Sequence, residues 1–471
     1  MKKLNAYLAA MIAVLTLAGC GSNAKTAETA DNAEPAAVQA ELNAAKDDAL
    51  AGAPEEKPSA EPEIAEEAAD EAYFGADLEG AGEAKLEFSA SKRMEAVKGE
   101  AEGAAADPSD EPVLPDEASS ETDPAIPQSG EPFVLTAGEW NDNENWGFFA
   151  NLVHSKKIEF PAYGLNPVNR VAVTVTHDGK PAANQLVALS DGDRGKGIWT
   201  AKTDRNGMAY LFYDAHLAGQ DLSIETVGAD AVAFTAPADE SGQGGSSVPT
   251  LEYTIETDAD TVEYTDTEVM FILDTTGSMG DEISYLQKDF AAIAEETADG
   301  HMTFSVNFYK DEGDAYVTLC NPFSDDVKEI GQALNREYAD GGGDEPEAVA
   351  QVLTDTIMYG EWREDTNKIA FLIFDAPPHS GEEYEAQLNA AIAAAAQKGI
   401  HLVPVVASNA ARETELFGRA AAIMTGSNYV FLTDDSGVGG SHLEPIIGDY
   451  DVELLHDIIV RNIRQIAGTA E

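Results

Sequence analysis

One stretch decides how the chain folds, and it reads Val269-Met270-Phe271-Ile272-Leu273-Asp274-Thr275-Thr276-Gly277-Ser278-Met279. Its apolar run predicts a buried β-strand that ends abruptly at an aspartate and a hydroxyl-rich turn. In open α/β sheets, ligands bind beyond the carboxyl ends of the strands, because the loops converge there. Asp274, Thr276 and Ser278 alternate, so three side-chain oxygens can converge on one hard divalent cation. The same residues also fit a strand, a turn and a helix cap, in which Thr276 or Ser278 binds free backbone amides.

The composition indicates that the chain has unlike parts. Its 471 residues carry a formal net charge of -58, from 86 acidic and 28 basic residues. Self-repulsion would destabilise a single folded domain with that balance, so we expect much of the acidic sequence to be extended. The charge also argues against nucleic acid, whose phosphates attract lysine and arginine. The two cysteines, Cys20 and Cys320, exclude a disulfide framework and any paired-cysteine metal motif.

The first 20 residues have the pattern of a signal peptide. A positive start precedes an apolar run from Ala6 to Leu17, which is too short to span a bilayer as a permanent helix. The segment Leu17-Ala18-Gly19-Cys20 resembles the lipobox of bacterial lipoproteins, in which the signal is removed and the cysteine is lipidated. The resemblance implies that Cys20 anchors the chain on the outer side of a bacterial cell membrane. The alternative is an ordinary signal peptide with an unmodified cysteine.

The next two regions differ sharply in character. Residues 21–131, rich in Ala, Glu and Pro, predict a disordered acidic tether, because they cannot bury enough apolar surface to offset their ordering entropy. In residues 132–238, short alternating strands separated by glycine and aspartate turns predict a small β-sandwich. The stretch from Val171 to Phe212 resembles the carboxypeptidase-regulatory-like and collagen-adhesin-B-like repeats of surface proteins, which implies a stalk.

The remainder of the chain alternates strands with helices. Residues 239–250 predict a linker, and residues 251–471 predict an α/β domain with a doubly wound, mostly parallel sheet. Two consecutive strands at 301–310 and 316–320, joined by an acidic turn, predict one antiparallel edge strand. The expected fold class is therefore α/β, with a small all-β sandwich and a disordered N-terminal tether.

Three loops of this last region resemble those of a von Willebrand factor type A domain. They are Asp274-Thr275-Thr276-Gly277-Ser278-Met279, Gly341-Gly342-Gly343-Asp344-Glu345-Pro346-Glu347 and Phe374-Asp375-Ala376-Pro377-Pro378-His379. In that family, the loops form the metal-ion-dependent adhesion site, which binds magnesium, manganese or calcium and accepts an acidic residue of a partner protein. Carried over by position, the resemblance implies that Mg²⁺, or else Ca²⁺ or Mn²⁺, is bound by Asp274, Thr276, Ser278, Asp344 and Asp375.

The second loop departs from the family pattern, because Asp344 stands where many members carry threonine. A third carboxylate would leave a divalent site one unit negative, so an incoming carboxylate would meet like charge. Three hypotheses follow. Asp344 points away or contacts the metal through water; the site holds calcium structurally; or the partner presents a neutral or basic group.

Four further residues are predicted to extend the partner-binding surface, and they are His379, Glu345, Asp434 and Asp435. His379 adjoins the third loop, where ligand contact and a simple loop role fit equally. Asp434 and Asp435 follow a strand that ends at the same sheet edge, where they can enlarge the acidic rim or cap the next loop. The histidines lack the spacing of a zinc site, and the Gly341–Gly343 turn lacks the residues of a phosphate-binding loop.

These observations favour a lipid-anchored surface lipoprotein that binds a protein partner through a divalent cation and is not an enzyme. No nucleic acid and no small-molecule cofactor are expected. The enzyme alternative is a metal-assisted hydrolase in which the ion activates water near His379. A third alternative is a structural cell-envelope protein whose cation site is degenerate.

Overall fold

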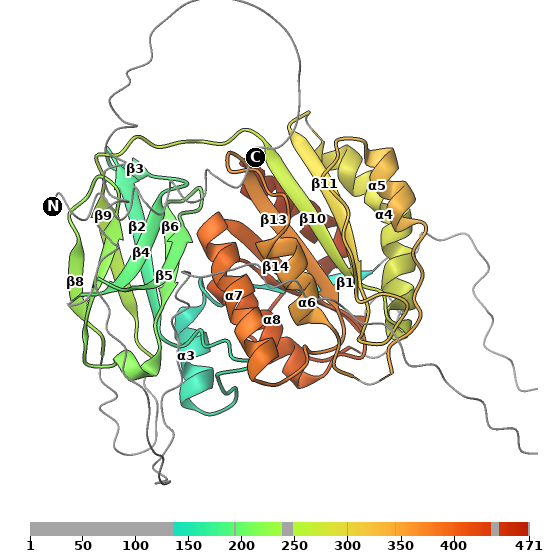
Figure 1. The fold of residues 1–471 in the computed structure, drawn as a ribbon, viewed down its shortest axis with the longest axis horizontal. Helices are drawn as coiled ribbons and strands as arrows, with labels where there is room; N and C mark the ends of the chain where they lie inside the picture. Colours follow the sequence, from blue (N-terminus) through green and yellow to red (C-terminus); the bar gives the residue numbers. More distant parts are fainter. Residues whose placement is uncertain are drawn as a thin grey trace, which may run out of the picture. The chain divides into compact units, whose positions relative to one another are not determined.

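A computed structural model of the protein describes residues 135–192, 195–237, 248–298, 300–343, 345–434 and 442–469 (Figure 1). All of them belong to one compact unit, Glu117–Glu471. The predicted signal peptide with Cys20, the predicted tether at 21–131 and most of the predicted linker lie outside the described residues. Two predicted site residues, Asp344 and Asp435, lie outside them as well.

The larger part of the fold is an α/β domain, as predicted. Its sheet contains eight of the described strands in the order β12-β11-β10-β13-β14-β15-β1-β16. The parallel strands are β10 (Thr267–Asp274), β11 (Met302–Tyr309), β13 (Asn367–Phe374), β14 (Ile400–Val406) and β15 (Tyr429–Leu432). The predicted antiparallel edge strand is β12 (Thr318–Leu319), and the opposite edge adds β1 (Thr136–Trp140) and β16 (Glu453–Leu454).

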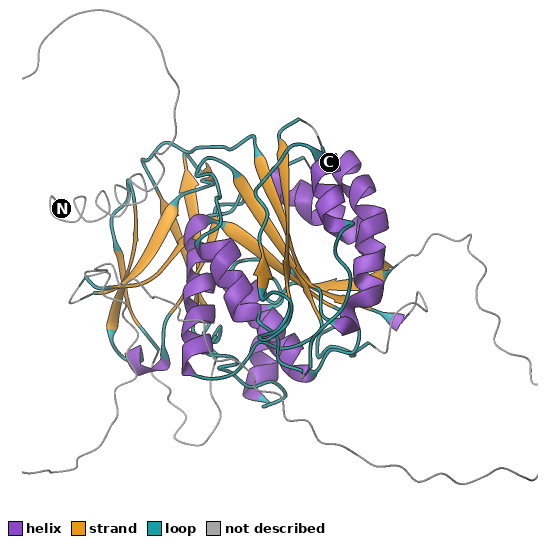
Figure 2. Cartoon of the chain, turned by 45° about the vertical axis from the view of Figure 1, so that its right-hand side comes forward, coloured by secondary structure: helices purple, strands orange, loops and turns teal. Residues whose placement is uncertain are grey.

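Helices cover both faces of this sheet (Figures 1 and 2). One face packs against α4 (Gly280–Thr297), α5 (Val327–Leu334) and α9 (Leu455–Ala467). The other packs against α3 (Trp146–His154), α6 (Val349–Leu353) with the π-helical turn η3 (Thr354–Met358), α7 (Glu382–Lys398) and α8 (Arg412–Met424). Successive residues of β10 alternate between the two cores, so the entire strand is buried, which explains its continuous apolar sequence.

The smaller part is the predicted β-sandwich. One sheet contains β2 (Arg170–His177), β3 (Lys180–Pro181), β6 (Met208–Phe212) and β9 (Leu251–Glu256). The other contains β4 (Leu186–Asp191), β5 (Gly197–Lys202), β7 (Asp221–Thr226) and β8 (Val232–Thr235), with the short turn η1 (Ala215–Leu217) between β6 and β7. Inward residues of both sheets, among them Val173, Leu189 and Ile224, form one core.

Two strands cross the predicted domain boundaries. Strand β1 lies in the predicted sandwich region 132–238, but it pairs antiparallel with β15 of the α/β sheet, with Ala137 opposite Leu432. Strand β9 lies in the predicted α/β region 251–471, but it pairs parallel with β2 of the sandwich. The boundaries inferred from composition therefore need correction, because partners so distant in sequence leave no local signal. The sandwich is inserted between the first and second strands of the α/β sheet.

The close fit of β1 against the sheet can be tested at Gly138. A Cβ atom there would collide with the ring of Phe431 and lie 2.8 Å from Tyr450. We expect Gly138→Ala to lower the free energy of unfolding by about 1–3 kcal/mol, because overpacking displaces both rings. The matched control is Gly147→Ala in α3, where a Cβ has nothing within 4 Å and we expect stabilisation by about 0.4–1 kcal/mol. Denaturant unfolding of both variants measures the difference, and equal effects would contradict the close packing of β1 against Phe431 and Tyr450.

None of the helices in the described ranges is both long enough and apolar enough to cross a bilayer.

Candidate functional site

The first loop of the site begins where β10 ends, at Asp274. This side chain is completely buried. The backbone N–H and the hydroxyl of Thr276 both donate to Asp274 Oδ1, at 2.9 and 2.7 Å. Asp274 Oδ2 has no hydrogen-bond partner of good geometry, although the buried Tyr309 hydroxyl also interacts with this carboxyl group. The turn therefore fixes the orientation of the carboxylate and leaves one of its oxygens available.

The third loop begins where β13 ends, next to β10 in the sheet, at Asp375. Asp375 is also buried, and the exposed Ser278 hydroxyl of the first loop hydrogen-bonds to it. Its Oδ1 atom has no partner. Parallel neighbouring strands thus bring Asp274, Thr276, Ser278 and Asp375 to one sheet edge, as the sequence predicted.

The second loop is held to the other two by buried hydrogen bonds. The ammonium group of Lys310 donates to the carbonyl oxygens of Thr275 and Asp340, which joins the first loop to the second. The backbone N–H of Glu347 donates to the carbonyl oxygen of Pro377 at 3.0 Å, which joins the second loop to the third. These contacts fix the relative positions of the three loops.

The loops enclose an open cleft of about 420 Å³. Thr276 and Ser278 line it from the first loop, Glu345 and Glu347 from the second, and Asp375 from the third. Asn409 and Ala411, in the loop that follows β14, line another side of the cleft. The cleft is wide enough for a side chain of another protein to enter.

Glu347 is the site residue that the sequence interpretation missed. Its side chain lines the cleft and is only 3% exposed, and its Oε2 atom has no hydrogen-bond partner. It belongs to the second loop, but a glutamate just after a proline at a helix start has an ordinary explanation and gives no functional signal by itself. The signal that could have identified it is its place at the end of the glycine loop.

Burial and mutual repulsion raise the pKa values of these acids. Burial, followed by the charge of Asp375, raises the pKa of Asp274 to about 7. Burial raises the pKa of Asp375 to about 6, with a further contribution from Glu282 behind it. Burial, followed by the charges of Asp274, Asp311 and Asp375, raises the pKa of Glu347 to about 9. The carboxyl groups therefore destabilise one another in the absence of a cation.

Sequence comparison agrees with this geometry. A family model described as the von Willebrand factor A domain matches residues 268–440. These residues form a von Willebrand factor A domain. Among solved structures, the chain is similar to the crystal structure of the conserved hypothetical protein BatB from Bacteroides thetaiotaomicron, with 15% identity and a TM-score of 0.32. That match covers 43% of this chain and 99% of BatB, and no curated protein matches the chain in sequence.

The residues of the A domain fit a divalent cation. In the described ranges, no three histidine, cysteine, aspartate or glutamate side chains are close enough to form a metal site by themselves. A cation would therefore depend on hydroxyl as well as carboxylate oxygens, and Asp274, Thr276, Ser278 and Asp375 supply both kinds. The unpaired oxygens of Asp274 and Asp375 support the fit, because a buried carboxylate oxygen without a partner is costly unless a cation compensates it.

The other predicted residues of the A domain are distributed differently. Glu345 is exposed and lines the cleft. His379 is not among the cleft-lining residues, and its Nε2 atom lies 2.6 Å from Asp311 Oδ1. Asp434 is also absent from the cleft and pairs with His442 at 2.6 Å. The structure thus brings only Glu345 of these three to the cleft.

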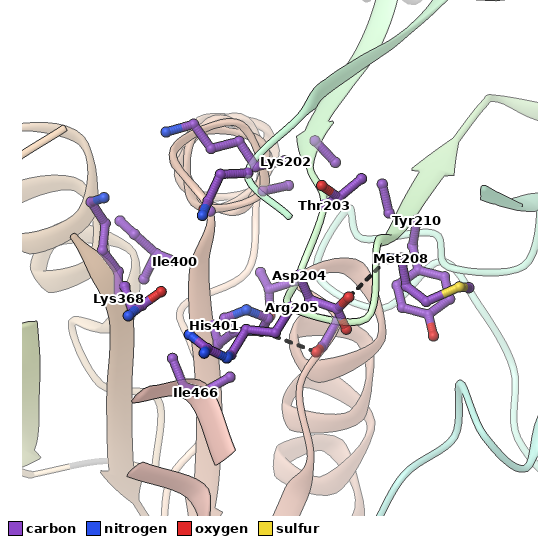
Figure 3. Close-up of a pocket in the computed structure, with 18 of the residues that line it drawn as sticks. Lys202, Thr203, Asp204, Arg205, Met208, Tyr210, Lys368, Ile400, His401 and Ile466 are labelled. Carbon is purple, nitrogen blue, oxygen red and sulfur yellow. Dashed lines mark hydrogen bonds between the residues drawn. The ribbon is translucent and has the colours of Figure 1, made fainter. Parts of the chain in front are cut away.

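A second, smaller cavity of about 40 Å³ lies between the sandwich and the A domain (Figure 3). Lys202, Arg205, Lys368 and His401 line it, at the opposite ends of β13 and β14 from the metal loops. Lys202 packs on Gly399 after α7, and Arg205 on Gly468 after α9, where a Cβ would collide with its guanidinium group. Positively charged side chains are stabilised at the carboxyl ends of helices. The positions of Lys202 and Arg205 are therefore explained without a bound ligand.

Proposed function

We propose that the protein is a membrane-anchored surface lipoprotein that binds a protein partner through a divalent-cation-dependent site in its A domain. One observation carries the proposal. Asp375, which lines the open cleft, and the fully buried Asp274, which is hydrogen-bonded to the cleft-lining Thr276, each have a buried carboxylate oxygen without a partner. Domains of this family commonly mediate protein interactions and are mostly not enzymes.

The proposed ion is Mg²⁺, with Ca²⁺ or Mn²⁺ able to replace it. Asp274, Thr276, Ser278 and Asp375 would hold it, and Asp344 is a further proposed ligand. All of these donors are oxygens, which magnesium and calcium prefer. The bound ion would supply a fixed positive charge and an open coordination position at the mouth of the cleft, where a partner side chain can reach it.

The remaining segments support a role at the cell surface. The proposed lipidation of Cys20 would anchor the chain on the outer side of the membrane, and residues 21–131 would hold the folded part away from it. Like-charge repulsion keeps such a segment extended. The sandwich would act as a stalk.

The function is tested by the cation dependence of binding. The chain from Gly21 onward, immobilised without its anchor, is incubated with envelope proteins in Mg²⁺, in chelator, and in chelator followed by excess Mg²⁺. We expect a partner that is retained with Mg²⁺, released by chelator and recovered when Mg²⁺ is restored, because the ion completes the contact. Partners retained equally in all three conditions would contradict the proposal.

A further inference from the structure

The carboxylate of Glu347 lies on the other side of Gly342 from the first loop. A Cβ atom placed on Gly342 would lie 3.0 Å from Glu347 Oε1 and 3.2 Å from the Cβ of Thr276. Glu347 and Thr276 therefore flank the same glycine and both line the cleft, while the backbone of Glu347 is bound to the third loop through Pro377. With Oε2 unpaired, the carboxylate stays buried in the cleft with one oxygen available.

Buried acids outnumber buried cations around the three loops. Among the described residues there, one ammonium group, that of Lys310, is buried, against the buried carboxyl groups of Asp274, Glu282, Asp311, Glu347 and Asp375. A divalent ion favours the ionised form of the carboxylates near it. Even with a divalent ion bound, the positive charges of the ion and of Lys310 do not balance the combined negative charge of these five carboxylates.

We propose that Glu347 keeps the loaded cation site negative, so that its open position accepts a neutral oxygen group of the partner, such as a hydroxyl or an amide carbonyl, in place of a carboxylate. Glu347 is not close enough to Asp274 and Asp375 to form a three-carboxylate metal site with them. In this proposal it therefore affects the ion through its charge and not as a direct ligand. A carboxylate entering the cleft would meet this charge where water screens it poorly. The inference rests on the proposed function, because it requires a bound cation.

Manganese binding to the full chain tests the inference, with the electron paramagnetic resonance signal of free Mn²⁺ as the readout. Titrations are run in sodium chloride and in sodium acetate of equal ionic strength, where acetate represents a partner carboxylate. The variant is Glu347→Gln, which keeps the shape of the side chain and removes its charge. The matched control is Glu361→Gln, which makes the same substitution at an exposed glutamate after η3 that does not line the cleft.

We expect Glu347→Gln to bind Mn²⁺ about tenfold more weakly in chloride, because one nearby negative charge is lost. Acetate should leave Mn²⁺ affinity of the wild type unchanged and should increase that of Glu347→Gln, since the effects of two ligands on each other are reciprocal. The Glu361→Gln control should behave as the wild type in both salts.

The inference is overturned if Glu347→Gln binds Mn²⁺ as tightly as Glu361→Gln, or if acetate already strengthens Mn²⁺ binding by the wild type. Either result leaves the proposed function intact provided that the wild type binds Mn²⁺ and Asp274→Asn does not. Failure of the wild type to bind any Mn²⁺ would overturn the proposed function together with this inference.

Discussion

Asp274→Asn is expected to abolish the stabilisation of the protein by Mg²⁺ while raising its thermal midpoint in chelator. In the absence of an ion, the buried Asp274 carboxylate repels that of Asp375 and has an oxygen without a partner. Asparagine removes the charge but can still accept the two hydrogen bonds from Thr276. It also removes a proposed ligand of the cation. In chelator the substitution is therefore stabilising, whereas in Mg²⁺ it removes the stabilisation that the ion gives the wild type.

The expected magnitude follows from mass action. At a free Mg²⁺ concentration about a hundredfold above the dissociation constant, binding stabilises the wild type by about 2.7 kcal/mol, which corresponds to several degrees in thermal midpoint. Thermal unfolding with Mg²⁺ and with chelator measures this shift in each protein.

Asp325→Asn provides the control, because that exposed aspartate lies in the loop before α5, away from the cleft-lining residues. It should show the same Mg²⁺ shift as the wild type. A shift of wild-type size in Asp274→Asn would show that Mg²⁺ acts elsewhere on the protein.

Sequence could predict those site residues that directly follow an apolar run, namely Asp274 and Asp375. An apolar run that stops at Asp274 or Asp375 places the aspartate at the carboxyl end of a strand, and parallel strands bring such ends together. The role of Glu347 was not predictable in this way. Its burial depends on the hydrogen bond to Pro377 and on contact with Gly342, which only the folded loops create.

The same limit explains the corrected domain boundaries. The α/β fold and most strands of the sandwich follow from local alternation of apolar and polar residues. Strand β1 has five residues and a mixed pattern, and its partners β15 and β16 lie near the other end of the chain. Pairing over that separation is determined by tertiary packing, which overrides local preference.

Arg419→Met is expected to lower the free energy of unfolding by about 3–5 kcal/mol, because it leaves the buried Asp142 carboxylate without its cation and removes one of the two arginines that pair with Glu415. Arg419 is fully buried in α8. Its guanidinium group donates to both oxygens of Asp142, at 2.8 and 2.7 Å, and to Glu415 Oε1 at 3.2 Å. A thermal midpoint lower by roughly 10 °C should accompany the loss. Denaturant unfolding measures it directly.

Two further variants identify the cause of that loss. Arg336→Met, at an exposed arginine after α5, should change stability by less than about 0.5 kcal/mol. Asp142→Asn combined with Arg419→Met should recover part of the stability, because much of the penalty comes from the carboxylate that is left buried and unpaired. A single-variant loss below about 1 kcal/mol, or no recovery in the double variant, would contradict this account. Since Asp142 precedes the sandwich and Arg419 lies in the A domain, the expected coupling would also show that the segment containing β1 is energetically part of the α/β fold.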